Sequence, residues 1–421
     1  MEKLLRLWNE EAKSAEFIKR DKIPLYRNGK VNVVSGIRRC GKTHFMFQLI
    51  QEFNKNVFYI DLEDERIIKP DIKFLNKLWE IIEENAEEGE LRVFIDEIQN
   101  VKGWEKFARR VAKRKDVLLF VSGSSSELTP KNIARTLRGR TLTNYLYPLN
   151  FREFLRFKGF DEEFSTAKRK CRRLIKEFLR FGGFPEIVLE EDTIAKIRIL
   201  QEYFSTIIER DIIEMQNVDN ITAMELLIKF VANNASRLMS FSAVKKWINS
   251  VGVKVGKATL IEYFSKIENA FFAFRNPIFS YSIKDVLQYP AKVYVADNGF
   301  ISALTLDLKE NIGWLLENLI AIELKKMQDA DPMLKIHYWK SKDNEVDFVV
   351  RRGVEVGKLM QVCAVREIDE IPKREIKALI RCSEELKCNK MEIITLEAEG
   401  SIRKNIKVIP LADFLLNKCC Q

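Results

Sequence analysis

One stretch constrains this chain more than any other: Gly36-Ile37-Arg38-Arg39-Cys40-Gly41-Lys42-Thr43. It fills every fixed position of the phosphate-loop pattern G-x-x-x-x-G-K-[ST]. Glycines let the backbone wrap closely around phosphates, so that several N–H groups can donate to them. Lys42 would reach the β- and γ-phosphates of a nucleoside triphosphate, and the Thr43 hydroxyl would help to bind Mg²⁺. The predicted nucleotide-binding residues are Gly36, Ile37, Arg38, Arg39, Cys40, Gly41, Lys42, Thr43 and His44.

The residues around this stretch fit a strand–loop–helix unit. The apolar run 31–34 indicates a buried strand, and apolar residues recur at helical spacing from 45 to 53. A helix that starts at Lys42 would add the positive end of its dipole to the anion site. Further along, we expect strands at 57–60 and 117–121 and helices at 75–82 and 99–115. Strands that alternate with helices predict an α/β fold with a parallel sheet.

Composition limits the class of protein. At 421 residues, two to four domains are expected. The net charge of +10 makes an anionic partner such as a nucleic acid plausible. The seven cysteines form no C-x-x-C pair, and we find neither a signal peptide nor an apolar run of membrane-spanning length, which predicts a cytoplasmic protein. With only two histidines, histidine-based catalysis and a histidine metal cluster are effectively excluded.

Polar residues end two of the expected strands. Val93-Phe94-Ile95 runs into Asp96 and Glu97 about fifty residues after the phosphate loop. Asp96 would hold Mg²⁺, and Glu97 would orient or polarise the attacking water, because one carboxylate cannot do both. After the strand at 117–121, either Ser122 or Ser124 could sense the γ-phosphate, and the alternative is a simple turn cap.

At this point the chain resembles the AAA+-type ATPases common in archaea and bacteria. The resemblance rests on the phosphate loop, the acidic pair, residues 122–125 and several later motifs. These motifs are Gly139-Arg140, Tyr147-Pro148-Leu149, Phe151-x-Glu153-Phe154, Gly182-Gly183-Phe184-Pro185, Glu209-Arg210-Asp211, 294–299 and 345–348. It implies a homo-oligomer in which an arginine of one subunit reaches the γ-phosphate bound by its neighbour. Arg140, with Arg138 in reserve, is the candidate, and structural ion pairs would explain these arginines equally well.

Residues 221–275 predict a winged helix-turn-helix. We expect helices at 223–231, 242–249 and 257–267 and then a strand at 271–274. This layout is similar to that of related family members. This segment has eight basic and three acidic residues, half of the excess charge of the whole chain. Lys245, Lys246, Lys254 and Lys257 are the predicted DNA contacts, since such a fold places a helix in the major groove and lysines on phosphates. The alternative is a winged helix that packs against protein only.

The C-terminal part carries the pattern of a restriction-endonuclease-like fold of the PD-(D/E)xK type. Glu317 is expected on a helix and Asp347 on a strand, where two carboxylates would hold a metal. An active enzyme continues with an acid, a spacer and a lysine. Here Gln361 and Cys363 stand at those two places. Because Cys363 cannot supply the lysine charge, we expect a degenerate nuclease site in a domain that binds DNA without efficient cleavage, aided by Lys340, Lys342 and Lys358.

These patterns combine into one prediction. The expected domains are an ATPase core at 1–150, a helical lid at 151–218, a winged helix-turn-helix at 219–300 and the nuclease-like domain at 301–421. The function would be Mg²⁺-dependent ATP hydrolysis coupled to binding or remodelling of duplex or branched DNA, with Glu97, Lys42, Ser122 and Arg140 in the reaction. The alternatives are an ATP-dependent switch that binds a protein partner and an ATP-powered nuclease.

Overall fold

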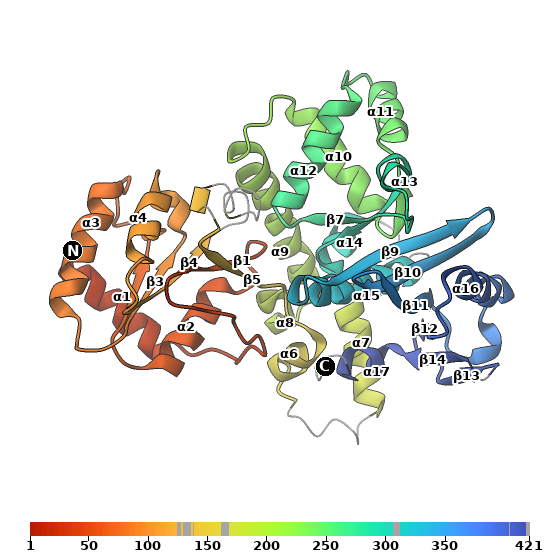
Figure 1. Ribbon diagram of the computed structural model, residues 1–421, viewed down its shortest axis with the longest axis horizontal. Helices are drawn as coiled ribbons and strands as arrows, with labels where there is room; N and C mark the ends of the chain where they lie inside the picture. The colour runs from red at the N-terminus through yellow and green to blue at the C-terminus, as the bar shows by residue number, and fades with distance from the viewer. Residues whose placement is uncertain are drawn as a thin grey trace. The chain divides into compact units, whose positions relative to one another are not determined.

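A computed structural model describes most of the chain. The described residues are 1–123, 128, 136–137, 139–160, 168–305, 312–403 and 405–417, with the backbone alone for 168–172 and 417. The chain forms two compact units (Figure 1). The first comprises Met1–Pro148, Glu209–Asn217 and Asn269–Phe271, and the second comprises Leu149–Ile208, Val218–Glu268 and Phe272–Gln421. Within the described ranges, no helix is both long and apolar enough to cross a membrane.

Five parallel strands form the sheet of the first unit, in the order β2-β3-β4-β1-β5. They are β1 (Val31–Ser35), β2 (Val57–Asp61), β3 (Leu91–Asp96), β4 (Val117–Gly123) and β5 (Thr141–Tyr145). Every residue of β1 and β4 is buried, as is typical of central parallel strands that helices cover on both faces. The predicted α/β class with a parallel sheet is confirmed.

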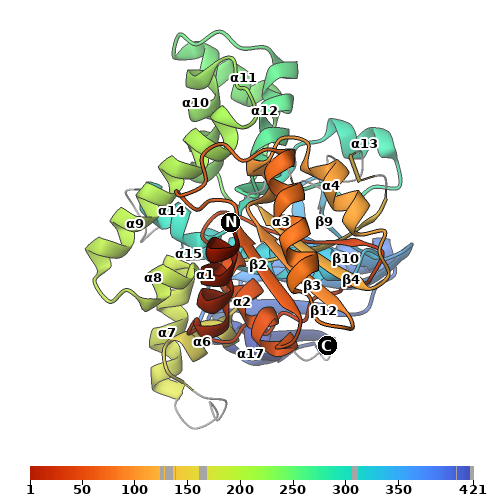
Figure 2. The ribbon, with the colours of Figure 1, turned by 90° about the vertical axis from the view of Figure 1, so that its left-hand side faces the viewer.

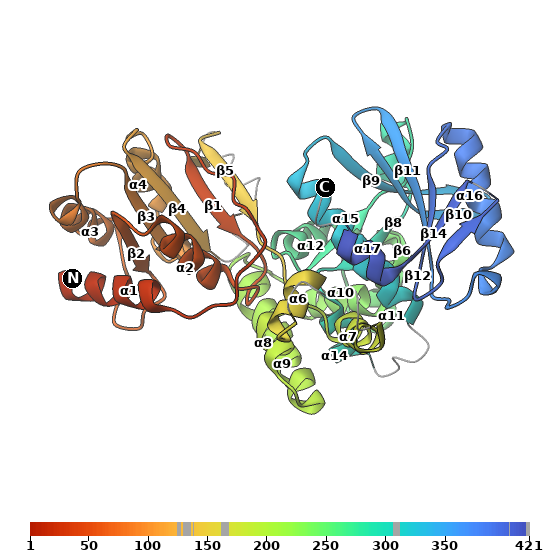
Figure 3. The ribbon, with the colours of Figure 1, turned by 90° about the horizontal axis from the view of Figure 1, so that it is seen from below.

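Helices cover both faces of this sheet. They are α1 (Glu2–Ser14), α2 (Lys42–Phe53), α3 (Ile72–Asn85) and α4 (Trp104–Val111), with the short 3-10 turn η1 (Ile98–Asn100). Figure 3 shows α1 and α2 on one face and α3 and α4 on the other. The prediction of a continuous helix over 99–115 is wrong, because Gly103 has a left-handed φ of +82° that interrupts helical hydrogen bonding.

The second unit begins with helices and a small antiparallel sheet. Its elements are α6 (Phe151–Phe157), α7 (Lys168–Phe181), α8 (Pro185–Leu189), α9 (Thr193–Thr206), α10 (Ile221–Asn233), β6 (Arg237–Met239), α11 (Phe241–Ser250), α12 (Lys257–Asn269), β7 (Ala273–Asn276), α13 (Ile283–Gln288) and β8 (Ala291–Val295). The π-helix η3 (Ile207–Glu214) follows α9. The three strands pair in the order β6-β8-β7, and α10, α11 and α12 pack together (Figure 2). The three helices expected between 221 and 270 are confirmed; the strand expected at 271–274 begins at Ala273, because Phe271 has a left-handed φ of +54°.

A mixed six-stranded sheet closes the second unit, in the order β13-β14-β12-β11-β10-β9. The elements are α14 (Asn298–Leu304), α15 (Ile312–Ala330), β9 (Leu334–Ser341), β10 (Asn344–Arg352), β11 (Glu355–Cys363), η4 (Ile368–Glu370), α16 (Lys373–Leu386), β12 (Met391–Thr395), β13 (Gly400–Ile402), β14 (Ile406–Pro410) and α17 (Leu411–Asn417). β9, β10 and β11 are antiparallel neighbours, whereas β11, β12 and β14 run parallel. Apolar residues of α16, such as Leu379, join those of the strands in one core.

A buried carboxylate joins two of the sequence motifs inside the second unit. Asp297 accepts hydrogen bonds from the backbone N–H groups of Gly183 and Gly299, each at 2.8 Å. A Cβ atom on Gly182 would lie 1.6 Å from Asp297 Oδ1, so only glycine fits there. Burial raises the pKa of Asp297 to about 6. The motifs at 182–185 and 294–299 therefore form one packing contact.

Candidate nucleotide-binding site

The phosphate loop connects β1 to α2, and its geometry requires glycine at both fixed glycine positions. A Cβ atom on Gly36 would lie 2.1 Å from the carbonyl oxygen of Leu146. Gly41 has a left-handed φ of +94°, and α2 begins at the next residue, Lys42. The N–H groups of the first helical turn therefore face the loop, where the helix dipole favours an anion. This local structure is suited to binding phosphate.

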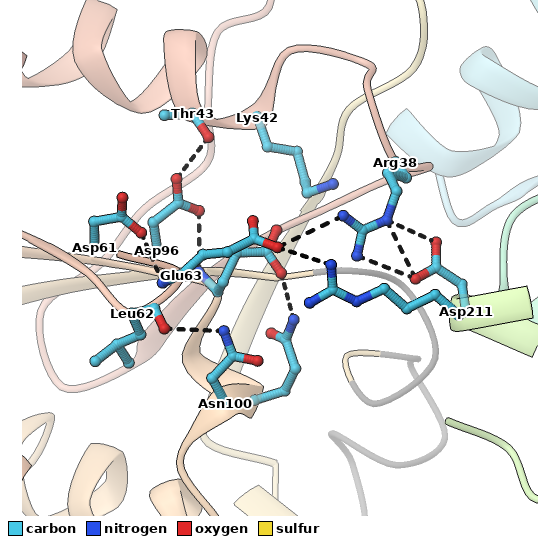
Figure 4. Close-up of polar contacts among 12 residues, drawn as sticks. Arg38, Lys42, Thr43, Asp61, Leu62, Glu63, Asp96, Asn100 and Asp211 are labelled. Carbon is cyan, nitrogen blue, oxygen red and sulfur yellow. Dashed lines mark hydrogen bonds and ion pairs between the residues drawn. The ribbon is translucent and has the colours of Figure 1, made fainter. Parts of the chain in front are cut away.

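The charge of Lys42 lies within the loop. Its side chain is buried, and the ammonium donates hydrogen bonds to the carbonyl oxygens of Gly36 and Ile37, both at 3.3 Å. Figure 4 shows Lys42 between the Thr43–Asp96 pair and the Arg38–Asp211 pair. A phosphate group in the loop would be in reach of this ammonium, whose contacts with two neutral carbonyls are easily exchanged for an anion.

Thr43 and Asp96 meet at the carboxyl edge of the sheet. The Thr43 hydroxyl donates to Asp96 Oδ2 at 2.6 Å, and the Tyr59 hydroxyl donates to the same oxygen at 3.1 Å. Asp96 is 2% exposed, and burial together with the adjacent Glu97 raises its pKa above the ordinary value. A hydroxyl and a carboxylate side by side are the hard oxygen ligands that Mg²⁺ prefers, so the residues fit this ion.

Glu97 follows Asp96 in a left-handed conformation, with φ of +48° and ψ of +47°. This conformation is uncommon for a residue with a side chain, and such outliers cluster at functional sites. The backbone N–H of Glu97 donates to Asp96 Oδ1 at 3.1 Å, and Gln99 Nε2 donates to Glu97 Oε2. The chain thus turns sharply between the two carboxylates, which lets them serve two different tasks.

Ser122 holds Asp96 from the neighbouring strand β4. It is fully buried, and its hydroxyl donates to Asp96 Oδ1. Its oxygen also accepts a hydrogen bond from the N–H of Glu97 at 3.4 Å. Ser122 therefore contacts both acidic residues, whereas Ser124, the other candidate for this role, lies outside the described residues.

The other predicted nucleotide-binding residues differ in exposure. Ile37 is buried, whereas Arg39 and His44 are exposed at the loop. The buried Cys40 thiol donates to the carbonyl oxygen of Leu146 at 3.4 Å, and burial raises the pKa of this thiol. Arg20, which the sequence analysis missed, donates to the carbonyl oxygens of Cys40 and Tyr147 at 2.9 and 2.8 Å. Cys40 and Arg20 thus stabilise the loop through hydrogen bonds to backbone carbonyl oxygens.

An ion-pair network contacts the loop from a distant part of the sequence. Arg38 pairs with Asp211 of η3, with Nε 3.3 Å from Oδ2. Glu63, which follows β2, lies 3.9 Å from Arg38 and 3.1 Å from Arg210 (Figure 4). Asp211 is fully buried, and its burial raises its pKa despite the neighbouring guanidinium. Glu209-Arg210-Asp211 was visible in the sequence only as a motif, because 173 residues separate Asp211 from Arg38.

Arg140 lies away from the phosphate loop of its own chain. It is exposed and precedes β5, which runs parallel to β1, and its carbonyl oxygen accepts from the N–H of Val31 at 2.8 Å. The loop follows the opposite end of β1, about 17 Å further along the strands. Arg140 and the phosphate loop therefore lie at opposite ends of these strands, and Arg138 lies outside the described residues.

The predicted DNA-contacting lysines are all on the surface. Lys245 and Lys246 lie on α11, Lys257 begins α12, and Lys254 lies between the two helices. All four side chains are exposed, and among the described residues none of them forms an ion pair. Their charges are therefore available to an anionic partner.

The predicted nuclease-like residues come together at one end of β10 and β11. Gln361 accepts from the backbone N–H of Asp347 at 3.2 Å and donates to Glu375 at 2.7 Å, and Glu317 approaches Asp347 from α15. Cys363 belongs to the apolar core, where burial raises its pKa to about 12 and keeps the thiol neutral. Lys292 of β8, which the sequence patterns did not single out, pairs with both Glu317 and Asp347. Lys292 is 25 residues from Glu317 and 55 from Asp347, and no sequence pattern connects residues at these separations.

Comparison with known proteins defines the class of the first unit. A family model described as an AAA domain matches residues 28–155, which include the phosphate loop and Asp96-Glu97. The chain therefore contains an AAA-type P-loop ATPase domain, a class that binds ATP, usually with Mg²⁺. A second family model, described as a domain of unknown function, matches residues 172–311.

Whole-chain relatives define the family. The chain is 37% identical over 399 residues to MJ1544, an uncharacterized protein of Methanocaldococcus jannaschii, covering 93% of this chain and 88% of that protein. It belongs to the family of MJ1544. An uncharacterized protein of Haemophilus influenzae is 28% identical over 336 residues, which cover 77% of this chain and 80% of that protein. Among solved structures, the Walker-type ATPase PABY2304 of Pyrococcus abyssi is similar at 15% identity and a TM-score of 0.44, covering 65% of this chain and 90% of that one.

Proposed function

We propose that this protein is a Mg²⁺-dependent ATP hydrolase that couples ATP turnover to binding or remodelling of DNA. The observation that carries the proposal is the meeting of Thr43, Asp96, Ser122 and Glu97 beside the phosphate loop. Thr43 and Asp96 would hold Mg²⁺, which would supply positive charge to the phosphate oxygens. Lys42 would bind the β- and γ-phosphates, and Glu97 would orient the attacking water and accept its proton.

The second unit supports the DNA part of the proposal. The element order α10-β6-α11-α12-β7-β8, with three antiparallel strands and with α13 between β7 and β8, supports the interpretation as a winged helix-turn-helix. The four exposed lysines, Lys245, Lys246, Lys254 and Lys257, lie on and between its second and third helices. Basic side chains at these places bind phosphates, and α12 is the helix that would enter the major groove.

In this proposal, η3 would connect nucleotide binding to DNA binding. This helix continues from α9, and its residues 209–214 belong to the unit that contains the phosphate loop. Arg38 pairs with Asp211, and a γ-phosphate would compete with this carboxylate for the guanidinium. We expect ATP binding to weaken the Arg38–Asp211 pair. The proposal also includes a homo-oligomer in which Arg140 completes the site of a neighbouring subunit.

ATP turnover measured with and without duplex, branched and single-stranded DNA tests the proposal. We expect turnover that requires Mg²⁺ and rises when duplex or branched DNA is added. The Asp211→Asn variant should show altered DNA stimulation while it retains ATP binding, because Asp211 is not a phosphate or metal ligand. Turnover that no DNA changes would contradict the coupling, and an absence of turnover with Mg²⁺ would contradict the hydrolase.

A second function is favoured by one surface. Four large apolar side chains, Tyr281, Ile283, Leu287 and Tyr289, are 84%, 79%, 79% and 56% exposed at and around α13. Exposed apolar groups gathered in this way are typical of protein-binding surfaces. A switch that binds ATP and a protein partner through α13 would show slow turnover that DNA leaves unchanged. The same DNA titration therefore separates the two functions.

A further inference from the structure

A lysine and three carboxylates form a closed cluster in the second unit. Lys292 Nζ lies 2.7 Å from Asp347 Oδ1, 2.9 Å from Glu345 Oε1 and 3.0 Å from Glu317 Oε1. The four groups come from three elements: Lys292 from β8, Glu317 from α15, and Glu345 and Asp347 from β10. The Lys292 side chain is only 3% exposed. Residues far apart in sequence thus place one ammonium at a point where three carboxylate oxygens converge.

This ammonium is engaged by all three carboxylates. A lysine ammonium has three N–H donors; here two hydrogen bonds go to Glu317 and Asp347, and Glu345 lies within ion-pair distance. The carboxylates are also held from outside: the Tyr294 hydroxyl donates to Glu317 Oε1 at 2.8 Å, and the Val362 N–H donates to Asp347 Oδ2 at 3.0 Å. The arrangement is that of a filled site.

These carboxylates do not fit a divalent metal in the present arrangement. A metal ion would need the same oxygens that now accept from Lys292, at about 2.0–2.6 Å. The described residues contain no group of three or more His, Cys, Asp and Glu side chains placed to hold a metal. Gln361, at the place of a further acid, has its amide committed to the Asp347 backbone and to Glu375. The Lys292 ammonium thus lies against Glu317 and Asp347, the two carboxylates expected to bind a metal.

We propose that Lys292 is the built-in cation of this cluster. Its ammonium takes the place of a divalent metal, stabilises the Glu317, Glu345 and Asp347 carboxylates, and closes the site to metal. The nuclease-like part of the chain would then hold a permanent internal cation that offsets part of the negative charge of its acidic residues. This inference does not depend on ATP hydrolysis, since the cluster lies entirely in the second unit.

Mn²⁺ binding to the full-length protein without nucleotide tests the inference. Free Mn²⁺ is followed by electron paramagnetic resonance for the wild type and for Lys292→Met, in which a neutral chain of similar length leaves the carboxylates without a cation. We expect Lys292→Met to gain one Mn²⁺ per chain, with an affinity about tenfold or more above that of the wild type. The added Mn²⁺ should also raise the melting temperature of this variant.

Matched variants show whether the gained ion sits in the cluster. Among the described residues, Lys340 forms an ion pair only with Glu345, at 3.4 Å, and it is 43% exposed; Lys340→Met therefore removes a lysine from the same surroundings without opening the centre. It should bind Mn²⁺ like the wild type. The double variant Lys292→Met/Asp347→Asn should lose the gained ion. If Lys292→Met folds and gains no Mn²⁺, the cluster is not a filled metal site and the inference is wrong.

The wild type provides an independent test if Lys292→Met does not fold. Wild-type protein that binds Mn²⁺ at a site abolished by Asp347→Asn would overturn the inference, because the cluster would then accept metal with Lys292 in place. Equal Mn²⁺ binding by the wild type and by the Asp347→Asn variant would support the inference. DNA cleavage lost in Lys292→Met and in Asp347→Ala alike would identify Lys292 as a catalytic lysine and would also overturn it.

Discussion

Lys42 and Glu97 are expected to act at different stages of one reaction. Lys42 lies inside the phosphate loop, so Lys42→Ala should abolish ATP binding. Glu97 follows Asp96, the proposed metal ligand, in a left-handed conformation, so Glu97→Gln should retain ATP binding and lower kcat by about 10² or more. Equilibrium binding of a fluorescent ATP analogue and single-turnover hydrolysis measure the two steps.

Glu88→Gln is the matched control for this pair of variants. Glu88 is exposed in the connection between α3 and β3 and should leave both binding and turnover unchanged. Near-normal turnover in Glu97→Gln would contradict the assignment of the water-orienting role.

His337 predicts a pH dependence of stability in the second unit. Its Nε2 accepts from Arg351 Nε at 3.1 Å, and burial, followed by the Arg351 charge, lowers the pKa of His337 to about 4. Between pH 6.5 and about 4 the unfolded state therefore binds more protons than the folded state. The contribution is fully present above pH 6.5 and is lost as the pH falls through this window, by about 2–3 kcal/mol in the free energy of unfolding.

Urea unfolding of wild type and His337→Gln across pH 4–7 measures this contribution as a difference. We expect the wild type to lose stability relative to His337→Gln as the pH falls. His44→Gln is the control, because it removes the other, exposed histidine and should follow the wild-type profile. Parallel profiles for wild type and His337→Gln would show that the buried histidine does not titrate in this way.

At the level of elements, α11 and α12 carry the proposed DNA surface. Replacing Lys245, Lys246 and Lys257 with Glu should weaken binding to every duplex sequence, because phosphate contacts carry no sequence information. The slope of log K against log salt should become less steep by about one unit for each contacting lysine lost. Fluorescence anisotropy over a series of salt concentrations measures both quantities.

The control for this charge reversal lies on another helix of the same unit. Lys373 and Lys377 of α16 and the following Lys387 are exposed, and among the described residues they form no ion pair. Their replacement with Glu changes the net charge equally and should weaken binding far less. Equal loss in both triple variants would indicate an effect of net charge alone, and unchanged binding in the first would place the DNA surface elsewhere.

For the whole molecule, we expect DNA binding without DNA cleavage. Gln361 and Cys363 supply neither an acid nor a cation, and Lys292 is fully engaged by carboxylates. Purified protein incubated with plasmid DNA and Mg²⁺ or Mn²⁺ should leave it intact, with or without ATP. Cleavage that disappears in Asp347→Ala would contradict this prediction, whereas cleavage that persists in that variant would point to a contaminating nuclease.

Lysines around the nuclease-like sheet are mostly engaged as well. Lys340 pairs with Glu345, and Lys358 pairs with Glu392 at 3.0 Å. The sequence suggested that both would line a DNA-binding cleft, and their ion pairs reduce the positive charge that they offer. This favours α11 and α12 over the C-terminal sheet as the proposed DNA-binding surface.

The sequence alone determined the nucleotide site, because the constraints on it are local. The glycines, Lys42 and Thr43 act within eight consecutive residues, and Asp96 and Glu97 end a strand that their apolar neighbours identify. Parallel strands bring such ends to one edge of a sheet, so the grouping of Thr43, Asp96 and Ser122 follows from the order of elements. The prediction of one helix over 99–115 was wrong, because the left-handed conformation of Gly103 interrupts the helix even though the residues around it have helical periodicity.

Only the tertiary structure decided which distant charges meet. Arg38 pairs with Asp211, 173 residues away in the sequence. Lys292 pairs with Glu317, 25 residues away, and with Asp347, 55 residues away. Burial makes an unpaired charge unfavourable, so each of these groups must find a partner, but periodicity and spacing do not say which one. For the same reason the sequence suggested open metal ligands at Glu317 and Asp347, and the fold supplied the lysine that fills the space between them.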